Sequence, residues 1–175
     1  MLLLALLLSG CSASGHTGAA PPSAAGTATG VSMTKQTDPA FTLRYPTTWT
    51  YLEGTGQYGI YNNFIGPRGH GGFEQAVLVG RTNNADKQVY ADAMTAYGIV
   101  HPDRKLEPAA PLVVSGAVQA DIVRNTRTLK GTPIRSWTVF VLTPSKVVLN
   151  IEFVAPAADF DEPLMSRILA SLHAT

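Results

Sequence analysis

The chain has 175 residues, of which 14% are charged and 45% hydrophobic, so its length suits one domain with short additions. It carries 13 lysines and arginines against 12 aspartates and glutamates, which argues against a nucleic-acid partner and against a polyacidic calcium cage. A single cysteine excludes an intramolecular disulfide.

The first predicted element is the apolar run MLLLALLL at residues 1–8, which is followed by Ser9, Gly10 and Cys11. Eight apolar residues are too few to span a bilayer, but they suit the hydrophobic part of a signal peptide. Small residues next to it suit a signal-peptidase cleft. No Lys or Arg precedes the run, so we expect the natural start to lie upstream.

Residues 11–37 are predicted to be a disordered tether that begins at Cys11. The segment after the cysteine consists almost entirely of Ala, Gly, Ser, Thr and Pro, which cannot bury enough apolar area to offset the entropy of ordering. The alternative, that Cys11 is an ordinary buried cysteine, would need a core around it, and this tract offers none. The folded domain is therefore expected at residues 38–175.

The first half of that domain reads as strands. Residues 41–46 (FTLRYP) alternate apolar and polar side chains, residues 59–65 are rich in aromatic side chains, and residues 74–81 (EQAVLVGR) are a strong strand candidate. Between the last two, Gly and Pro mark residues 66–72 as a loop.

The pattern then changes to a helical period over residues 85–97. Asn84 or Asp86 lies near the expected cap, and Gly98 is expected to end the helix. A proline-rich connection over residues 101–111 follows.

The second half contains three strands at hairpin spacing, over residues 117–129, 134–142 and 147–154. Lys130-Gly131 and residues 143–146 are the turns between them, so an antiparallel meander is predicted.

A final helix is expected after Asp159, with Glu162 completing an acidic variant of the capping box. Its apolar stripe comprises Phe160, Leu164, Ile168, Leu169 and Leu172. The sum is an α+β domain, in which two or more helices cover an antiparallel sheet of about six or seven strands.

Neither a metal site nor a nucleophilic site emerges from the sequence. The four histidines, His16, His70, His101 and His173, are widely scattered, and a zinc site needs three or four converging ligands. Ser115 is followed by a glycine but lacks the first glycine of a Gly-x-Ser-x-Gly elbow. We therefore expect no metal, no cofactor and no enzyme activity.

Two groups of residues are candidates for binding. In the loop of residues 66–72, Arg68 and His70 could help backbone N–H groups to hold an anion, although a mobile surface loop is the favoured interpretation. The second group is aromatic and comprises Trp49, Tyr51, Tyr58, Tyr61 and Phe64. Packing in the core is the favoured explanation for it, and the alternative is a groove for a partner protein or an apolar molecule.

Two resemblances extend this interpretation. Leu8-Ser9-Gly10-Cys11 resembles the bacterial lipobox, which implies a lipid on Cys11 and a domain that faces the outer side of the cell membrane. The stretch Phe41–Pro46 with Trp49, and the closing Ile168-Leu169-Ala170-Ser171-Leu172, resemble PsbP-like and Mog-type domains. That resemblance implies an α/β/α sandwich and no shared catalytic residues.

Within that superfamily, the lipobox and tether are similar to actinobacterial LpqN/LpqT-type lipoproteins. This similarity implies a non-catalytic protein-binding or scaffold module in envelope biogenesis. The alternative is a carrier or sensor of a small apolar envelope molecule or lipid, held in a cleft between sheet and helices.

Overall fold

The computed structural model describes residues 30–56 and 59–175, without the side chains of residues 55–60. The predicted signal peptide, Cys11 and most of the predicted tether lie outside the described residues. None of the described helices is long and apolar enough to cross a membrane.

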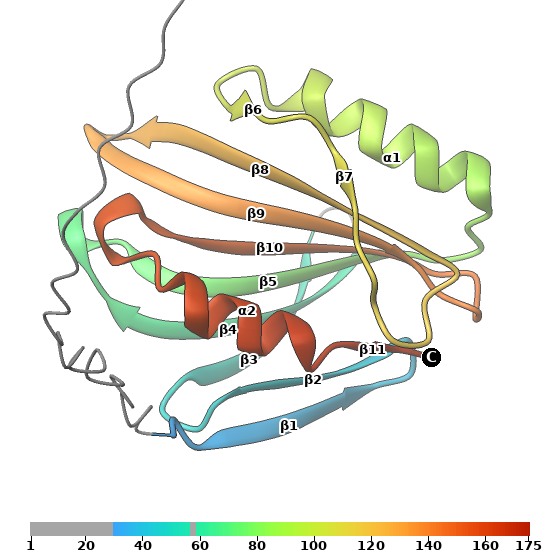
Figure 1. Ribbon diagram of the computed structural model, residues 1–175, viewed down its shortest axis with the longest axis horizontal. Coiled ribbons are helices and arrows are strands. Elements are labelled where there is room, and N and C mark those ends of the chain that lie inside the picture. The colour runs from blue at the N-terminus through green and yellow to red at the C-terminus, as the bar shows by residue number, and fades with distance from the viewer. Residues whose placement is uncertain (1–29, 57–58) are drawn as a thin grey trace, which may run out of the picture. The chain divides into compact units, whose positions relative to one another are not determined.

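Within this part of the chain, two antiparallel sheets and two α-helices form an α+β fold, which confirms the predicted class (Figure 1). The small sheet has the order β1-β2-β11, and its strands are β1 (Met33–Asp38), β2 (Phe41–Pro46) and β11 (His173–Ala174). The large sheet has the order β3-β4-β5-β10-β9-β8-β6, and β7 also pairs with β8. Its strands are β3 (Thr50–Gly56), β4 (Gly59–Arg68), β5 (Glu74–Thr82), β6 (Lys105–Leu106), β7 (Ala110–Pro111), β8 (Gln119–Leu129), β9 (Thr132–Leu142) and β10 (Val148–Pro156).

The predicted meander is present as β8, β9 and β10, which are neighbours in the large sheet. Lys130 and Gly131 both have positive φ, 47° and 81°, as a two-residue hairpin turn with the twist of its strands requires. These turn residues fix the register, in which Leu129 faces Thr132 and Ile122 faces Val139. The β8–β9 hairpin therefore follows from its turn residues and from the alternation in β8, whereas β9 is buried without a break from Ser136 to Leu142.

The folded region begins before residue 38, which shortens the predicted tether. Strand β1 pairs with β2 along its whole length, from Met33 opposite Pro46 to Asp38 opposite Phe41. Only Met33 of this strand packs against the core, and most of its other side chains are exposed. A polar edge strand of this kind lacks the apolar alternation by which strands are recognised, so its composition resembles that of a tether.

Helix α1 (Lys87–Val100) continues past residue 97, where its C-terminal end was predicted. Of the two candidate caps, Asp86 is the N-cap, and its carboxylate accepts hydrogen bonds from the N–H groups of Gln88 and Val89. Gly98 does not end the helix, because one glycine weakens a helix by only about 1 kcal/mol and packing can offset that loss. A Cβ placed at Gly98 would lie 3.5 Å from Leu106, so this turn packs closely on β6.

Helix α2 (Glu162–Ala170) begins at a different cap from the predicted one. Asp161, not Asp159, accepts from the N–H of Leu164, and a proline in the first turn suits a helix that starts there. The predicted Asp159–Glu162 capping box is therefore wrong. Asp159 ends a short 3-10 turn, η2 (Ala157–Asp159), and its carboxylate binds another loop.

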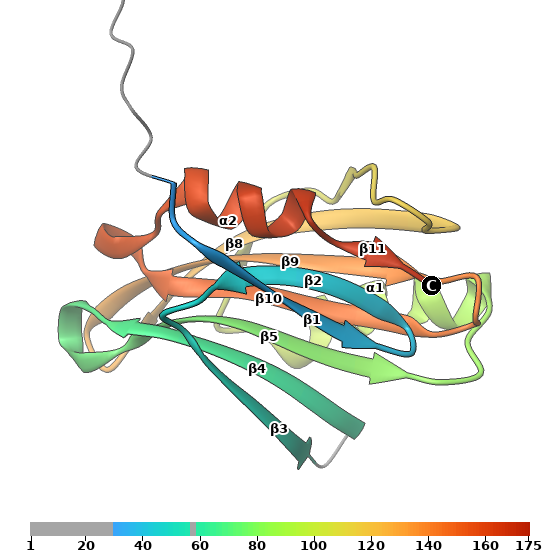
Figure 2. The same ribbon diagram turned by 90° about the horizontal axis from the view of Figure 1, so that it is seen from below.

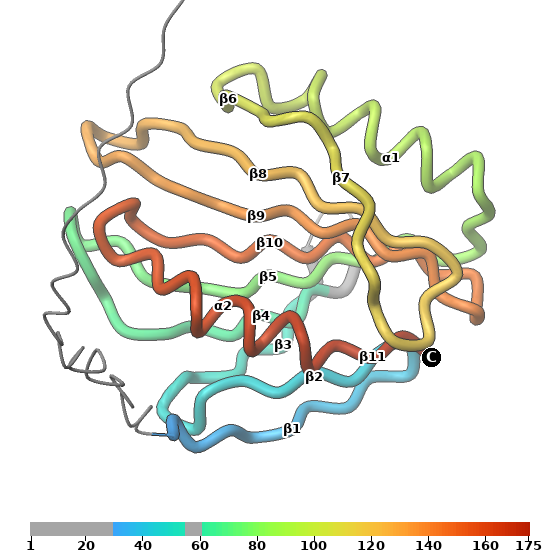
Figure 3. Tube along the Cα trace, in the orientation of Figure 1, coloured from blue at the N-terminus to red at the C-terminus, as the bar shows by residue number. Residues whose placement is uncertain are grey.

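The two faces of the large sheet are covered differently. Helix α2 and the small sheet lie on one side, which we call the α2 face, and α1 lies on the other, the α1 face (Figure 2). The α2 face holds the larger core, which includes Phe64, Val77, Trp137, Ile151 and Phe153. The smaller core under α1 contains Tyr90, Tyr97, Val123, Phe140, Leu142 and Val148. In the trace, α1 runs beside β8 and β9, away from β3 and β4 (Figure 3).

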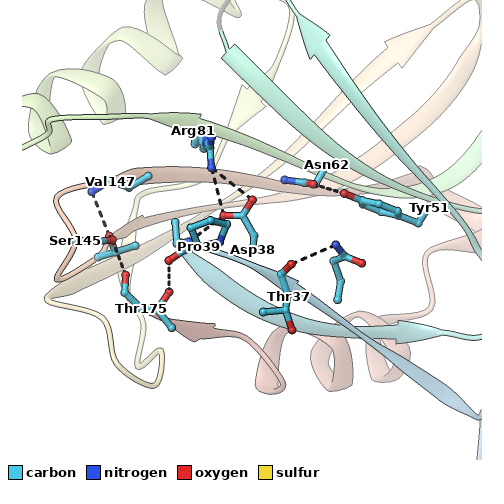
Figure 4. A network of polar contacts seen from close by, with 12 residues as sticks. Thr37, Asp38, Pro39, Tyr51, Asn62, Arg81, Ser145, Val147 and Thr175 are labelled. Carbon is cyan, nitrogen blue, oxygen red and sulfur yellow. Dashed lines mark hydrogen bonds and ion pairs between the residues drawn. The ribbon is translucent and has the colours of Figure 1, made fainter.

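Polar contacts join the small sheet to the large one (Figure 4). Arg81 of β5 donates to both carboxylate oxygens of Asp38 at the end of β1, at 3.4 Å each. The Thr175 hydroxyl donates to the Pro39 carbonyl at 2.7 Å, and Ser145 donates to the Thr175 carbonyl at 2.6 Å. The C-terminal end of the chain is thereby fixed between the two sheets.

Candidate functional site

The main candidate site is a groove between α1 and the part of the α1 face that this helix leaves uncovered. Helix α1 packs on residues of β8, β9 and β10, such as Val123, Phe140 and Val148. Strands β4 and β5 lie beyond it in the sheet, and neither of the two described α-helices packs on them on this face. The resulting groove has a volume of about 640 Å³.

The floor of the groove is set by strand register. Asn150 of β10 lies opposite Gly80 of β5, and Leu78 lies between Asn63 of β4 and Glu152 of β10. A Cβ at Gly80 would lie 3.5 Å from the Tyr61 ring, so Tyr61 covers the space that this glycine leaves. Side chains that are paired across a sheet share a face, so these residues line one surface.

The opposite wall is formed by α1 and the residue after it. Ala93, Val100 and His101 line the groove there, and Val100 is 64% exposed. The groove is thus apolar along the helix and mixed on the sheet, where Tyr61 and Leu78 lie beside two asparagines. The side-chain amides of Asn63 and Asn150 make no hydrogen bond within the part of the chain that is described, so both are available to an occupant.

A buried polar network includes Glu152, which lines the groove. The Arg104 guanidinium lies 2.6 Å from the Glu152 carboxylate, donates to the Tyr97 hydroxyl, and is only 4% exposed. The Tyr97 hydroxyl lies 2.7 Å from the Thr138 hydroxyl and accepts from the Asn125 amide at 3.2 Å. Because Glu152 is held by Arg104, the one carboxylate that lines the groove is not a free acid or base.

Burial and neighbouring charges shift the pKa values in this network. Burial raises the pKa of the Tyr97 hydroxyl, so the group stays protonated. Burial alone would lower the pKa of Arg104, but the Glu152 carboxylate and the Tyr97 hydroxyl together raise it. Burial, followed by the Arg104 charge, lowers the pKa of His101, whose ring lies 4.8 Å from the Tyr97 ring. His101 therefore borders the groove as a neutral imidazole at neutral pH.

The aromatic candidates divide between core and groove. Trp49 is 6% exposed and Phe64 is fully buried, and both belong to the core of the α2 face, so packing explains these two. Tyr61 lines the groove. Tyr58, like Cys11, lies outside the described residues.

The two loop candidates are engaged with neighbouring carboxylates. Arg68 pairs with Glu74 at 3.1 Å on the surface. The backbone N–H and the ring Nδ1 of His70 each lie 2.6 Å from an oxygen of Asp159. The His70 N–H, followed by the His70 ring, lowers the pKa of that carboxyl group. In this structure a carboxylate of the chain itself therefore occupies the loop where an anion was considered.

Sequence reasoning did not identify the pair of Ser115 and His173. The Ser115 hydroxyl lies 2.9 Å from His173 Nδ1, and both residues are exposed. In the described part of the chain, no carboxylate hydrogen-bonds to His173, and Gly116 packs against the Ala174 carbonyl. The contact fastens the loop before β8 to strand β11, and the Ser115–His173 backbone bridge supports that role.

Metal binding finds no support in residues 30–56 and 59–175, where no group of three or more His, Cys, Asp or Glu could hold an ion. The groove residues themselves lie far apart in the sequence, on β4, β5, α1 and β10. No local motif could have indicated them. The only signal was the aromatic cluster, which included Tyr61.

Comparison with known proteins supports the fold. No family model matches the chain, and no curated protein matches it in sequence. Among solved structures, it is similar to LpqN, which is involved in cell envelope biogenesis of Mycobacterium tuberculosis, with a TM-score of 0.62. The match has 15% identity and covers 82% of this chain and 91% of LpqN.

A second similar structure is PA94 of Pseudomonas aeruginosa, a protein of unknown function, with a TM-score of 0.52. The match has 18% identity and covers 79% of this chain and 94% of that one. At these identities the two similarities show a shared fold and nothing more. The fold shared with LpqN agrees with the predicted similarity to LpqN-type proteins at the level of the fold.

Proposed function

We propose that this protein is a non-catalytic binding module of the bacterial cell envelope, held at the membrane by a lipid on Cys11, with the groove beside α1 as its binding surface. The observation that carries the proposal is the half-covered α1 face, which leaves a groove of about 640 Å³ with free amides on its floor. The resemblance of residues 8–11 to a lipobox and the fold shared with LpqN support an envelope location.

The occupant that we favour is an apolar segment of an envelope protein. The groove is open along its length, with Val100 exposed on one side and Tyr61 and Leu78 on the other. Apolar side chains next to unsatisfied amides suit a peptide, which offers both apolar side chains and backbone hydrogen-bonding groups. LpqN is itself involved in envelope biogenesis, which is in line with a role through partners.

The second candidate is a carrier or sensor of a small apolar envelope molecule or lipid. The volume of the groove favours it, because pockets for small molecules usually measure about 300 to 1,000 Å³. In both cases the chain binds without catalysing a reaction. The pairing of Glu152 with Arg104 supports this view, since it ties up the carboxylate nearest to the occupant.

The lipid anchor is tested by Cys11→Ser. We expect this variant to leave the membrane fraction or to remain unprocessed, because two acyl chains supply the anchoring energy at about 0.8 kcal/mol per methylene. Metabolic labelling with a fatty-acid probe measures the acylation directly. Unchanged labelling of the variant would disprove the anchor without affecting the groove.

The groove is tested by photo-crosslinking in cells. A photoreactive phenylalanine analogue replaces Val100 in the groove or, as a control, Val113, which is 97% exposed and does not line it. The groove is then blocked by Gly80→Leu, with Glu53→Leu as the control on the edge strand β3, because Glu53 is exposed and lies opposite Asn62, on the other face of the sheet from Tyr61.

Adducts that form at position 100, disappear with Gly80→Leu and persist with Glu53→Leu support the proposal. Mass spectrometry then separates the two candidates, because a protein adduct indicates a binding module and a lipid adduct indicates a carrier. Equal adducts at position 113, or adducts that persist with Gly80→Leu, would contradict it.

A further inference from the structure

The layer that the small sheet and α2 form carries cationic side chains on its outer surface. Lys35 of β1 lies directly opposite Arg44 of β2, so the two side chains project from the same face of the small sheet. The neighbours of Arg44 along the strand, Leu43 and Tyr45, are buried in the core of the α2 face. The face that Lys35 and Arg44 share is therefore the outer one, and both residues are exposed there.

Helix α2 adds a third cation to this surface. The Ser171 hydroxyl, at the end of α2, accepts a hydrogen bond from the Arg44 N–H at 2.8 Å, which holds the end of the helix beside β2. Arg167 lies one helical turn before Ser171 and is exposed. Its guanidinium donates to the Val31 carbonyl at 3.1 Å, just before β1 begins. We call Lys35, Arg44 and Arg167 the basic surface.

No carboxylate balances these charges in the part of the chain that the structure describes. None of the three cations makes an ion pair there. In residues 31–47 and 164–175, which contain all three, the one acidic side chain is Asp38, and Arg81 of the large sheet holds it. Like charges directly opposite each other destabilise a sheet, so an anion above the β1–β2 pair would relieve an unfavourable contact. The whole chain has a formal net charge of only +1, so the basic surface is a local concentration of positive charge.

The chain enters the domain at this same surface. Val31, whose carbonyl Arg167 holds, comes roughly 20 residues after Cys11, and such a length of chain spans at most about 70 Å. A lipid on Cys11 would therefore keep the basic surface within that distance of the membrane. Linkage of this kind gives the second contact a high effective concentration, so a weak attraction is sufficient for docking.

We propose that the basic surface docks on anionic lipid headgroups of the membrane that holds the anchor. This inference rests on the proposed function for its membrane location. Each Lys or Arg close to an anionic membrane strengthens binding about fivefold, so three of them give a clear preference for anionic lipid. Because α1 lies on the opposite side of the large sheet from α2 and the small sheet, docking turns the groove away from the membrane (Figure 2). The groove is then open to a partner in the envelope.

The test measures how the full Cys11→Ser chain, which has no thiol to acylate, binds phosphatidylcholine vesicles with and without phosphatidylglycerol. The apolar run of residues 1–8 is the same in every variant, so the ratio of the two affinities reports the effect of charge. We expect a preference of at least about tenfold for the anionic vesicles at low salt. It should disappear in about 1 M sodium chloride, which screens charges beyond about 3 Å. Acylation is not needed, so this test can fail or succeed independently of the lipid anchor.

Single substitutions then assign the preference to the basic surface. Lys35→Gln and Arg44→Gln should each lower it about fivefold, because each removes one charge. Neither side chain hydrogen-bonds to a described residue, since Arg44 takes part only through its backbone. The matched control is Lys87→Gln, on an exposed lysine at the start of α1, and it should leave the preference unchanged.

Charge reversal separates docking from folding. Lys35→Glu places a carboxylate opposite Arg44, so it should keep or raise the free energy of unfolding while it lowers the preference further than Lys35→Gln does. If the preference falls only in variants that also lose stability, the cations support the fold and the proposal is wrong. Equal binding to both kinds of vesicle, which is the result if the surface takes an acidic protein instead, would overturn it. So would a loss with Lys87→Gln as large as that with Lys35→Gln.

Discussion

The large sheet has one face that is covered almost completely and one face that is covered only in part. On the α2 face, α2 and the small sheet cover β4, β5, β10 and β9, and the residues there are apolar and almost fully buried. On the α1 face, one helix covers the β8–β10 part and leaves β4 and β5 open. Adjacent residues of one strand therefore have opposite environments, as Phe64 and Asn63 of β4 do.

The difference separates the part of the molecule that stabilises the fold from the part that can bind. Burial of apolar area is the main source of stability, so the α2 face should carry most of it. The α1 face instead contains a buried ion pair, free amides and a groove, which add little stability and offer specific contacts.

The largest expected effect is on the α2 face. Phe64→Ala should lower the free energy of unfolding by about 3–5 kcal/mol, because it removes a fully buried ring and leaves a cavity. Tyr45 and Tyr51 stack on that ring at centroid distances of 4.7 and 5.3 Å, so collapse can fill the space only partly. Urea denaturation measures the loss, and a value below about 1 kcal/mol would mean that the α2 face is not closely packed.

The next effect concerns the ion pair under α1. Glu152→Ala leaves the Arg104 guanidinium buried without its carboxylate and should lower the free energy of unfolding by about 2–4 kcal/mol. The double variant Arg104→Met/Glu152→Leu should recover most of this loss, because no unpaired charge remains. Equal losses in the single and double variants would show that the pair itself stabilises the fold. Glu53→Ala, on an exposed residue of β3, is the control.

A smaller effect should appear as a pH dependence. The pKa of His101 is lower in the folded state than its unfolded value of about 6.5, first through burial and then through Arg104. The unfolded chain therefore binds the proton more readily, and stability should fall as the pH drops below about 6.5. His101→Gln should flatten the curve between about pH 5.5 and 7.5. Thermal unfolding at a series of pH values measures this, and an unchanged slope in the variant would contradict it.

Asp159 gives the matched acid control for that experiment. Its pKa is lowered by the His70 N–H, so its contribution is present at neutral pH and is lost only at about pH 4 and below. Asp159→Asn should therefore change the acid limb and leave the His101 region as it is.

The sequence predicted the central strands better than the edge strand β1 and the helix caps. Alternation identified β2 and β8, because half-buried strands repeat every two residues, whereas β5, β9 and β10 were identified as apolar runs and, for β9 and β10, by the turns between them. It missed β1, whose side chains face mostly solvent, and it placed the cap of α2 at Asp159 instead of Asp161. Caps depend on which of several acidic residues reaches a free N–H, and composition does not decide that.

The candidate site could be predicted only in part, for a geometric reason. Tyr61 and Phe64 belong to one aromatic cluster, but residues three apart on a strand point to opposite faces, so only Tyr61 reaches the groove. Gly80, Asn150 and His101 have no local pattern that marks them. How far α1 extends over the sheet is decided by packing of distant residues, such as Tyr97 on Phe140, and no single segment encodes it.

The smallest effect on stability is expected in the groove itself. Asn63→Ala should change the free energy of unfolding by no more than about 0.5 kcal/mol, because the Asn63 side chain makes no hydrogen bond with the residues that the structure describes. Asn63 is the sequence neighbour of Phe64, so the pair Asn63→Ala and Phe64→Ala compares the two faces at one point of β4. Urea denaturation of both variants measures the contrast. Similar losses in the two variants would mean that the α1 face contributes to the free energy of unfolding as the α2 face does. The groove would then be part of the stabilising core and not a surface that is free to bind.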